Sequence, residues 1–423
     1  MDCQFSPSHL AGRTVPPASK SETHRRLICA GLSRETSTLE GLTASQDTVA
    51  TMRCLRALGA DISGTEGTVT VRGFARRPEL LPVLDCGESA STLRFFVPVA
   101  MVLAHGGIFR MHGRLSQRPM DIYRELFVPR GVLWRMREGA DGAAELTVTG
   151  DLGAGDYVLP GNVSSQFVSG LLFALPMLDG DSTLKVLPPI ESASYIAMTV
   201  RALREGGIEV RERENGLWEI PGRQRYHAQN GVMQADWSQA AVLLCMDALG
   251  AEIGVEGVNE RSIQGDRAVL AHLETLGAEI VREDGCISVK PGELHGAELD
   301  LHDTPDIAPI LALVCQLAKG ESRLTGCGRL RLKECDRLAA TVRLLNALGG
   351  DAREEGDTIA VRGVERLRGG VTVDGCHDHR MVMLLSAAAS VAQQPVTVQG
   401  VEALEKSWPD YLDVYRALGG KAE

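Results

Sequence analysis

The sequence predicts an α/β protein of two similar domains, each built from three repeats of about 70 residues. Three observations lead to this expectation. A chain of 423 residues is too long for one hydrophobic core. Its 44% apolar and 23% charged residues are ordinary for a globular protein. A helix-to-strand pattern also recurs along the chain at nearly constant spacing.

The recurring element is a helical stretch that ends at a glycine, which accepts the left-handed backbone conformation at little cost. These stop glycines follow one another every 70 to 76 residues, at Gly59, Gly131, Gly207, Gly277, Gly349 and Gly419. In five copies a β-prone segment then runs to a second glycine, at Gly73, Gly150, Gly222, Gly292 and Gly363. Two such regular series indicate duplication of one α/β unit.

The sixth stop glycine lies only four residues from the C-terminus, so no strand can follow it. We expect the segment before Pro16 to supply the missing strand, which places both termini in one domain. Six units divide as three plus three near residue 235. We therefore expect a first domain of residues 1–18 and 236–423 and a second of residues 19–235, with the active site in the cleft between them.

Composition excludes several classes of protein. A net charge of −11, 4% aromatic residues and no run of Lys and Arg argue against a nucleic-acid partner. No apolar stretch is long enough for a membrane span, and the N-terminus lacks the apolar region of a signal peptide. The ten cysteines form no CxxC pair, which is typical of reduced thiols in the cytoplasm. His377 and His379 lack a companion cluster, so we expect no metal.

Three segments of the first half place small or hydroxyl side chains at expected helix starts. In SKSETHRRL (19–27), Ser19 and Glu22 have capping-box spacing, and Lys20 then opposes the helix dipole. Ser21 and Arg25 share a face of this helix. CGESASTLR (86–94) and GNVSSQF (161–167) offer N–H and hydroxyl groups to an anion. Each segment alone fits an ordinary capped helix equally well or better.

Four segments of the second half carry most of its candidate charges. In TPDIAP (304–309), Thr304 is the expected N-cap, and Asp306 either stabilises the helix start or acts as a general base. In RLKECDRL (331–338), we expect Lys333 and Arg337 on one helical face, with Glu334 beside Lys333. A solvated, ion-paired helix is the plainer explanation of that segment. HDHRMVM (377–383) and KSWPDY (406–411) complete the set.

Taken together, the segments resemble the enolpyruvyl transferase family, in its shikimate-pathway branch. GRLSQRP, ESASYI and QGD match as well, so the resemblance covers residues 12 to 415 or so. It implies two domains of three βαβαββ repeats, no cofactor or metal, and a monomer without nucleic-acid or membrane partners. The implied reaction transfers the enolpyruvyl group of phosphoenolpyruvate to the 5-hydroxyl of shikimate 3-phosphate. Phosphate leaves through a tetrahedral intermediate.

The resemblance also implies site residues, motif by motif. On the shikimate 3-phosphate side they are Lys20, Ser21, Arg25, Ser164, Ser165, Gln166, Ser192, Tyr195, Asp306 and Lys333. On the phosphoenolpyruvate side they are Lys20, Ala90, Arg118, Gln166, Arg337, Arg380 and Lys406. Asp306 is the expected acceptor of the hydroxyl proton. Lys20 and Glu334 are both candidates for protonating the methylene carbon.

Three positions depart from the family pattern. Ala90 replaces a glycine against which the inhibitor glyphosate sits, so we expect reduced glyphosate sensitivity. Arg329 stands where relatives often have Asn, and Ala193-Ser194-Tyr195 replaces a segment such as Lys-Pro-Tyr.

Two alternatives remain at this point. The sister enzyme that acts on UDP-N-acetylglucosamine usually has Lys-Asn where this chain has Lys20-Ser21. Many of its members also have a cysteine in a loop where residues 95–131 here have none. A non-catalytic anion binder on the same fold would not need the acid and base candidates Asp306 and Glu334.

Overall fold

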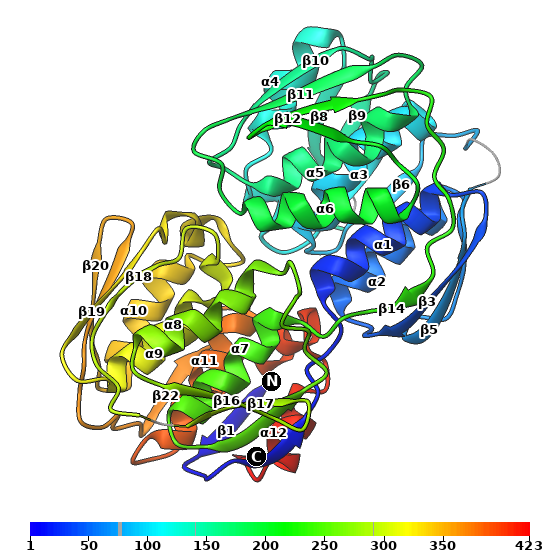
Figure 1. Ribbon diagram of the computed structural model, residues 1–423. Coiled ribbons are helices and arrows are strands. Elements are labelled where there is room, and N and C mark those ends of the chain that lie inside the picture. Colours follow the sequence, from blue (N-terminus) through cyan, green and yellow to red (C-terminus); the bar gives the residue numbers. More distant parts are fainter. Residues whose placement is uncertain (75–77, 140, 291) are drawn as a thin grey trace. The chain divides into compact units, whose positions relative to one another are not determined.

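The structure is a computed structural model that describes residues 1–423 except 75–77, 140 and 291. The chain forms two compact units (Figure 1). Unit 1 comprises Met1–Pro17 and Gln234–Glu423, and unit 2 comprises Ala18–Met233. The chain therefore passes from one unit to the other twice, after Pro17 and after Met233.

Unit 2 contains three repeats. The first comprises α1 (Lys20–Leu32), β3 (Thr36–Leu42), α2 (Gln46–Ala57), β4 (Asp61–Ser63), β5 (Gly67–Arg72) and the late strand β14 (Gly231–Val232). The second comprises β6 (Val83–Asp85), α3 (Ala90–Ala104), β7 (Gly106–Met111), α4 (Asp121–Phe127), β8 (Leu133–Glu138) and β9 (Ala144–Thr149). The third comprises β10 (Asp156–Pro160), α5 (Ser165–Ala174), β11 (Ser182–Leu187), α6 (Ala193–Glu205), β12 (Arg211–Glu214) and β13 (Leu217–Ile220).

Unit 1 contains the other three repeats. The fourth comprises β2 (Ala11–Thr14), α7 (Trp237–Ala248), β15 (Glu252–Glu256), α8 (Val269–Thr275), β16 (Glu279–Glu283) and β17 (Cys286–Lys290). The fifth comprises β18 (Glu298–Asp300), α9 (Ala308–Leu317), β19 (Glu321–Thr325), α10 (Arg337–Ala347), β20 (Asp351–Glu355) and β21 (Thr358–Arg362). The sixth comprises β22 (Val371–Asp374), α11 (His379–Val391), β23 (Val396–Gln399), α12 (Tyr411–Ala417), β24 (Lys421–Ala422) and β1 (Asp2–Ser6).

Each repeat builds a four-stranded sheet with one strand order, as in β6-β7-β9-β8 and β18-β19-β21-β20. The first two strands of each sheet are parallel, and the other pairings are antiparallel. In the sixth sheet, β1 lies between β23 and β24, with Cys3 opposite Val398 and Phe5 opposite Ala422. The N-terminal segment thus supplies a strand of the sixth sheet, as predicted, and both termini belong to unit 1. The prediction that no strand follows Gly419 is wrong, because the two-residue strand β24 pairs with β1 there.

The six stop glycines all adopt the left-handed conformation, with φ between 76° and 102°. This confirms the repeat that the sequence predicts. At Gly277 a side chain would also meet the backbone, because an added Cβ would lie 2.8 Å from the carbonyl oxygen of Glu293.

The helices pack inside each unit and the sheets lie toward its outside (Figure 1). Helices α3, α5, α9 and α11 are buried on almost every face, which explains why their sequences are mostly apolar. Each unit has its own hydrophobic core. A charged side chain on these buried helices therefore needs a specific partner.

Candidate active site

The first helix of each repeat in unit 2 begins with a candidate residue directly after a capping serine. Ser19, Ser89 and Ser164 precede Lys20, Ala90 and Ser165, the first residues of α1, α3 and α5. The serine hydroxyls accept from the backbone N–H groups of Glu22 at 3.4 Å, Thr92 at 3.3 Å and Gln166 at 3.3 Å. These three helix starts are confirmed. Their remaining N–H groups and positive dipole ends favour anions.

Arg25 is the most deeply buried of the predicted cations in unit 2, with 3% of its surface exposed. Its guanidinium donates to the carbonyls of Ser21 at 2.7 Å and Tyr195 at 2.9 Å and to the Thr199 hydroxyl at 2.8 Å. Burial lowers the pKa of Arg25 to about 10. Among the residues that the structure describes, no carboxylate pairs with Arg25. It is a buried cation held by neutral acceptors.

Lys20 has a carboxylate partner that the motif did not include. Its Nζ lies 2.8 Å from Oδ2 of Asp47 in the first turn of α2, and Asp47 is buried. This ion pair stabilises a cation that otherwise opposes the dipole of α1.

A second buried arginine, Arg94 of α3, organises the residues at the start of α5. It donates to Oε1 of Gln166 at 2.8 Å, to the Ser164 hydroxyl at 3.4 Å and to the carbonyl of Pro119 at 2.7 Å. The Gln166 amide donates in turn to the Ser91 hydroxyl at 2.8 Å. Through Arg94, the starts of α3 and α5 therefore lie near Pro119, the residue after Arg118.

The other predicted residues of unit 2 lie near these groups to different degrees. Tyr195 contacts Arg25 through its carbonyl, and the Arg25 guanidinium lies 5.9 Å from the centre of its ring. Ser192 precedes α6 in a left-handed conformation, with φ 54°, and is buried. Arg118 is half-buried after a 3₁₀ turn at Leu115–Gln117.

The centre of the candidate residues in unit 1 is Arg337, which is 2% exposed and contacts three carboxylates. It donates to both oxygens of Asp378, at 2.7 and 3.1 Å, to Asp306 at 2.8 Å and to Glu334 at 2.6 Å. Burial alone would lower the pKa of Arg337, but the charges of Asp378, Glu334 and Asp306 outweigh it and raise that pKa well above its usual value.

Asp306 is shared between two cations. Lys333 Nζ and Arg337 Nη1 lie 2.9 and 2.8 Å from the same oxygen, Oδ1. Burial would raise the pKa of Asp306, but Lys333, Arg337 and Arg380 together hold it well below the usual range. Burial lowers the pKa of Lys333 against the opposing effect of Asp306, and the charge of Arg329 lowers it further.

Two local predictions in unit 1 are wrong. Lys333 and Arg337 do not share a helical face, because Lys333 follows a 3₁₀ helix at Gly328–Leu332 and α10 starts only at Arg337. The Asp336 side chain accepts from the N–H of Ala339 at 3.0 Å and so begins a new helix there. Thr304 makes no capping hydrogen bond, and Pro305–Ile307 forms a 3₁₀ turn before α9.

The remaining predicted cations of unit 1 are largely buried. The Arg380 guanidinium, on α11, donates to the carbonyl of Ser238 at 2.8 Å. The Asp378 side chain caps α11 by accepting from the backbone N–H of Arg380 at 2.9 Å. Lys406 ends the 3₁₀ helix Val401–Lys406 and is 4% exposed. Arg329 donates to the carbonyl of His302 at 2.8 Å, so this departure from the family pattern ties two loops together.

Asp266 is a buried carboxylate that the sequence did not single out as a site residue. Ser238 donates to its Oδ2, whereas Oδ1 is buried without a hydrogen bond among the described residues. Burial and the charge of Asp306 raise the pKa of Asp266 to about 7, against the opposing effects of Ser238 and Arg380.

Asp47, Arg94, Asp266 and Asp378 are therefore the residues that motif reasoning missed. Arg94 had a detectable signal, since it is the single charged residue in the apolar stretch 90–104. Asp378 also had one, as an N-cap candidate before the apolar segment that starts at 379.

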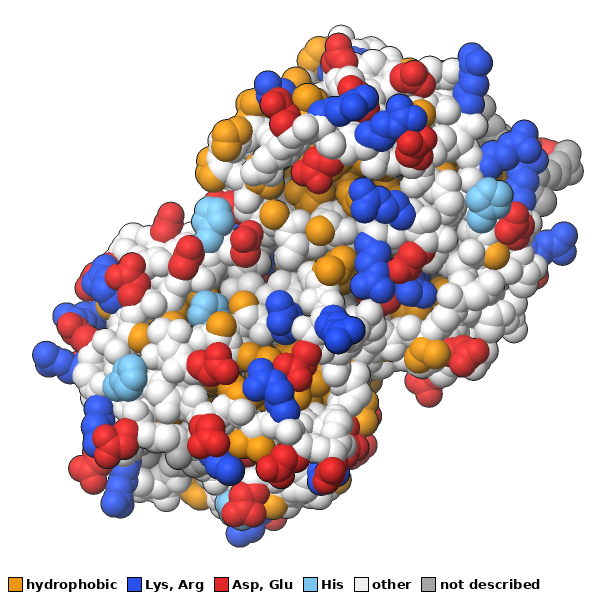
Figure 2. Space-filling view, viewed as in Figure 1, with side chains coloured by type: hydrophobic (Ala, Val, Ile, Leu, Met, Phe, Trp, Pro, Cys, Tyr) orange, Lys and Arg blue, Asp and Glu red, His pale blue; other side chains and the backbone are white. Residues whose placement is uncertain are grey.

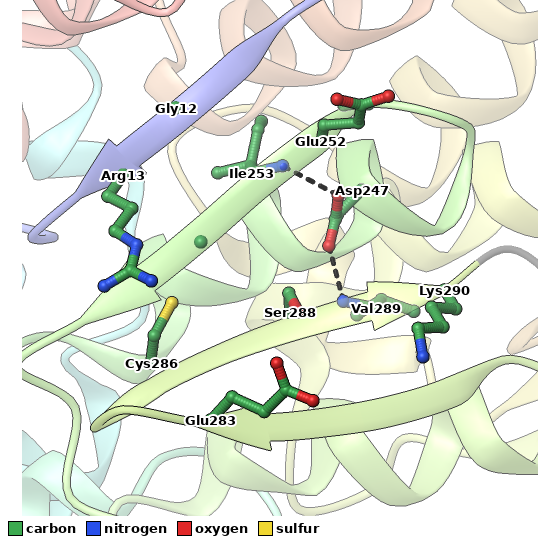
Figure 3. A pocket seen from close by; sticks show the side chains of 12 residues that line it. Gly12, Arg13, Asp247, Glu252, Ile253, Glu283, Cys286, Ser288, Val289 and Lys290 are labelled. Atoms are coloured by element: carbon green, nitrogen blue, oxygen red, sulfur yellow. Dashed lines mark hydrogen bonds between the residues drawn. The ribbon is translucent and has the colours of Figure 1, made fainter.

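A surface hollow of about 450 Å³ lies apart from these residues, on the sheet of the fourth repeat (Figure 3). Strands β15 and β17 pair only at Val255–Glu256 and splay apart beyond them. Asp247 bridges the gap by accepting from the N–H groups of Ile253, at 2.8 Å, and Val289. The hollow is lined by both signs of charge and contains none of the predicted site residues, so we assign it no part in the chemistry.

The face drawn in Figure 2 carries Lys and Arg as well as Asp and Glu side chains. In the described part of the chain, no group of three or more His, Cys, Asp or Glu side chains could hold a metal ion. No helix within that part is both long and apolar enough to cross a bilayer.

Comparison with known proteins identifies the family. A model of "EPSP synthase (3-phosphoshikimate 1-carboxyvinyltransferase)" matches residues 6–415. The chain belongs to this family. A 3-phosphoshikimate 1-carboxyvinyltransferase of Clostridium botulinum is 37% identical over 98% of this chain and 96% of the relative. Its counterpart in Clostridium kluyveri is 36% identical over 99% and 97%.

The fold agrees with that membership of the EPSP synthase family. A solved EPSP synthase from Acinetobacter baumannii superposes with a TM-score of 0.79, covering 100% of this chain and 99% of that one at 24% identity. The predicted α/β class and its two-domain fold are therefore confirmed.

We expect Asp266 to make stability depend on pH. A carboxyl whose pKa is raised on folding binds a proton in the folded protein between about pH 4 and pH 7 that the unfolded chain has lost. Stability should therefore fall as pH rises through this window and then level off. Denaturation of wild type and Asp266→Asn from pH 4.5 to 8 measures this effect. The wild type should lose stability relative to the variant up to about pH 7, and a constant or growing wild-type advantage would contradict the assignment.

Proposed function

We propose that the protein transfers the enolpyruvyl group of phosphoenolpyruvate to the 5-hydroxyl of shikimate 3-phosphate and releases phosphate. Family membership supports the reaction class. The observation that carries the substrate assignment is Arg25, a guanidinium 3% exposed. Among the described residues it donates only to neutral oxygens, and the rings of Phe95 and Tyr195 lie 5.4 and 5.9 Å from it. That it acts in the cytoplasm, as a monomer and without a cofactor is part of the same proposal.

A buried cation without a counter-ion is costly, so Arg25 favours an anionic ligand. Guanidinium groups bind phosphate and carboxylate through paired N–H donors. Lys20, Ser21 and the hydroxyls of Ser164 and Ser165 add a second charge and neutral donors at helix starts of the same unit. We assign the phosphate-bearing ring of shikimate 3-phosphate to this group, with Gln166, Ser192 and Tyr195.

Unit 1 supplies the other cations. Its carboxylates Asp306, Glu334 and Asp378 all pair with Arg337. We assign phosphoenolpyruvate to Arg337, Arg380 and Lys406, together with Lys20, Ala90, Arg118 and Gln166. Arg337 and Lys333 hold Asp306 ionised. When substrate anions attract these two cations, the pKa of Asp306 rises and its carboxylate becomes a stronger acceptor for the hydroxyl proton.

The proton for the methylene carbon has two candidate donors. Glu334 lies 2.6 Å from Arg337 Nη2 and is the anion of that ion pair. Lys20 is the cation of its ion pair with Asp47. This contrast favours Lys20 as donor, with Glu334 helping to hold Arg337.

A phosphate-release assay tests the function directly. Release should require both phosphoenolpyruvate and shikimate 3-phosphate, and release without the shikimate ester would contradict the proposal. Asp306→Asn should lower kcat by about 10²- to 10⁴-fold, the usual range for a lost general base, while substrate binding persists. Asp303→Asn, an exposed neighbour, is the matched control and should keep full activity.

We also expect weak inhibition by glyphosate. Ala90 is buried at the first residue of α3, so its methyl group occupies space that a glycine would leave open. Crowding by one methyl group typically costs about 1 to 3 kcal/mol, so Ala90→Gly should tighten glyphosate inhibition by about fivefold or more.

The control is Ala100→Gly, the same substitution further along α3. Inhibition titrations of the wild type and both variants decide the point. Equal inhibition constants for wild type and Ala90→Gly would refute the role of the methyl group. Tighter inhibition of Ala100→Gly would show that the effect comes from destabilisation of α3.

A further inference from the structure

A chain of buried polar side chains links the first three helices of unit 2. His24 of α1, Thr51 of α2 and Thr92 of α3 each have at most 1% of their surface exposed. His24 Nδ1 lies 2.7 Å from the Thr51 hydroxyl, which lies 2.8 Å from the Thr92 hydroxyl. The Thr92 hydroxyl donates in turn to the Ser89 hydroxyl at 2.9 Å. The chain therefore ends on the serine that caps α3.

The donors of this chain all point the same way. A hydroxyl has one hydrogen, and Thr92 gives its hydrogen to Ser89. Thr92 must therefore accept from Thr51, and Thr51 must accept from His24. This order requires a hydrogen on Nδ1 of His24. Burial lowers the pKa of His24 to about 3, so the imidazole is neutral and its Nε2 has no hydrogen.

His24 contributes little to the core except this hydrogen. Its Nε2 is buried and has no hydrogen-bond partner among the described residues. A buried polar atom without a partner destabilises a fold, and an apolar side chain would avoid that penalty. The ring packs edge-on against Phe95, with 6.4 Å between the ring centroids. An aliphatic side chain could fill the same space, so the hydrogen bond to Thr51 is what distinguishes histidine here.

The serine at the end of the chain fixes the first turn of α3. Ser89 accepts from the backbone N–H of Thr92 at 3.3 Å and from its hydroxyl at 2.9 Å. The next two residues belong to the candidate site. Ala90 begins α3, and the Ser91 hydroxyl accepts from the Gln166 amide at 2.8 Å. A displaced cap would therefore move both of them.

We propose that His24 is a positioning residue, which holds the start of α3 in place for phosphoenolpyruvate through the two threonines and the Ser89 cap. With its hydrogen on Nε2, His24 would accept from Thr51, Thr51 would accept from Thr92, and Ser89 would lose its second donor. His24 belongs to the helix that carries Lys20 and Arg25. The chain thus connects the two sets of substrate residues in unit 2, and this inference rests on the proposed function.

Substitution of Thr51 interrupts the chain with little change in side-chain shape. Thr51→Val replaces the hydroxyl by a methyl group, and Thr51→Ser, the matched control, keeps the hydroxyl. In the phosphate-release assay, Thr51→Val should raise the KM for phosphoenolpyruvate about two- to tenfold, the ratio that corresponds to one neutral hydrogen bond. The KM for shikimate 3-phosphate should stay the same, and Thr51→Ser should keep both values. A side chain that only stabilises the fold would lower the unfolding temperature without separating the two KM values.

Substitution of His24 tests the donor at the head of the chain. His24→Asn can place an amide N–H near the Nδ1 position and should keep the KM for phosphoenolpyruvate, whereas His24→Leu should raise it as Thr51→Val does. Because both changes act through one chain, the double variant of His24→Leu and Thr51→Val should be no worse than either single variant. Ring ¹⁵N NMR of the wild type, assigned by the signals missing in His24→Asn, should show a neutral imidazole with its hydrogen on Nδ1 from pH 5 to 8.

Three results would overturn the proposal. They are an unchanged KM for phosphoenolpyruvate in Thr51→Val, an equal rise of both KM values in that variant, and a hydrogen on Nε2 of His24. A wild-type protein that releases no phosphate from the two substrates would refute the proposed function instead. The NMR measurement would still test the chain in that case, because it needs neither substrate.

Discussion

Buried cations are the constraint on which the candidate site depends. Burial opposes a positive charge, so each buried cation needs compensation. The two units meet this need differently. In unit 1 the Arg337 guanidinium contacts the carboxylates of Asp306, Glu334 and Asp378. In unit 2 the Arg25 guanidinium donates only to neutral oxygens among the described residues and lies against the rings of Phe95 and Tyr195. Arg337 therefore has its counter-ions within the protein, whereas Arg25 favours an anion from outside it.

The repeat explains why these charges collect at helix starts. In the second, third, fifth and sixth repeats the first two strands are parallel, so the helices after them begin at the same edge of the sheet. Repetition of the unit therefore produces several sheet edges of this kind. In unit 2, serines at positions 19, 89 and 164 cap the first helix of each repeat. In these helices the backbone N–H groups and polar side chains that can contact an anion lie in the first turn, next to the capping serine. Duplication of one fold element thus produces several anion-favouring positions.

Features fixed by neighbouring residues could be predicted, and pairings between distant residues could not. The stop glycines and the caps of α1, α3 and α5 depend on local backbone conformation and were found from the sequence. The partners Asp47 and Asp378 lie 27 and 41 residues from Lys20 and Arg337, beyond the reach of a motif. Lys333 and Arg337 were misplaced because Asp336 starts a new helix inside the expected one. They still meet at Asp306, through tertiary contact rather than helical spacing.

Ligand-induced stabilisation of Arg25→Met and Arg26→Met tests the central claim most directly. Arg26, the next residue, forms ion pairs at 3.0 Å with both Glu22 and Glu205 and therefore has its counter-ions already. The shift in unfolding temperature on adding shikimate 3-phosphate is measured against each variant's own ligand-free value, so differences in intrinsic stability cancel. The account predicts that Arg25→Met loses the shift and that Arg26→Met keeps it. A full shift in Arg25→Met would contradict the view that Arg25 is completed by a substrate anion.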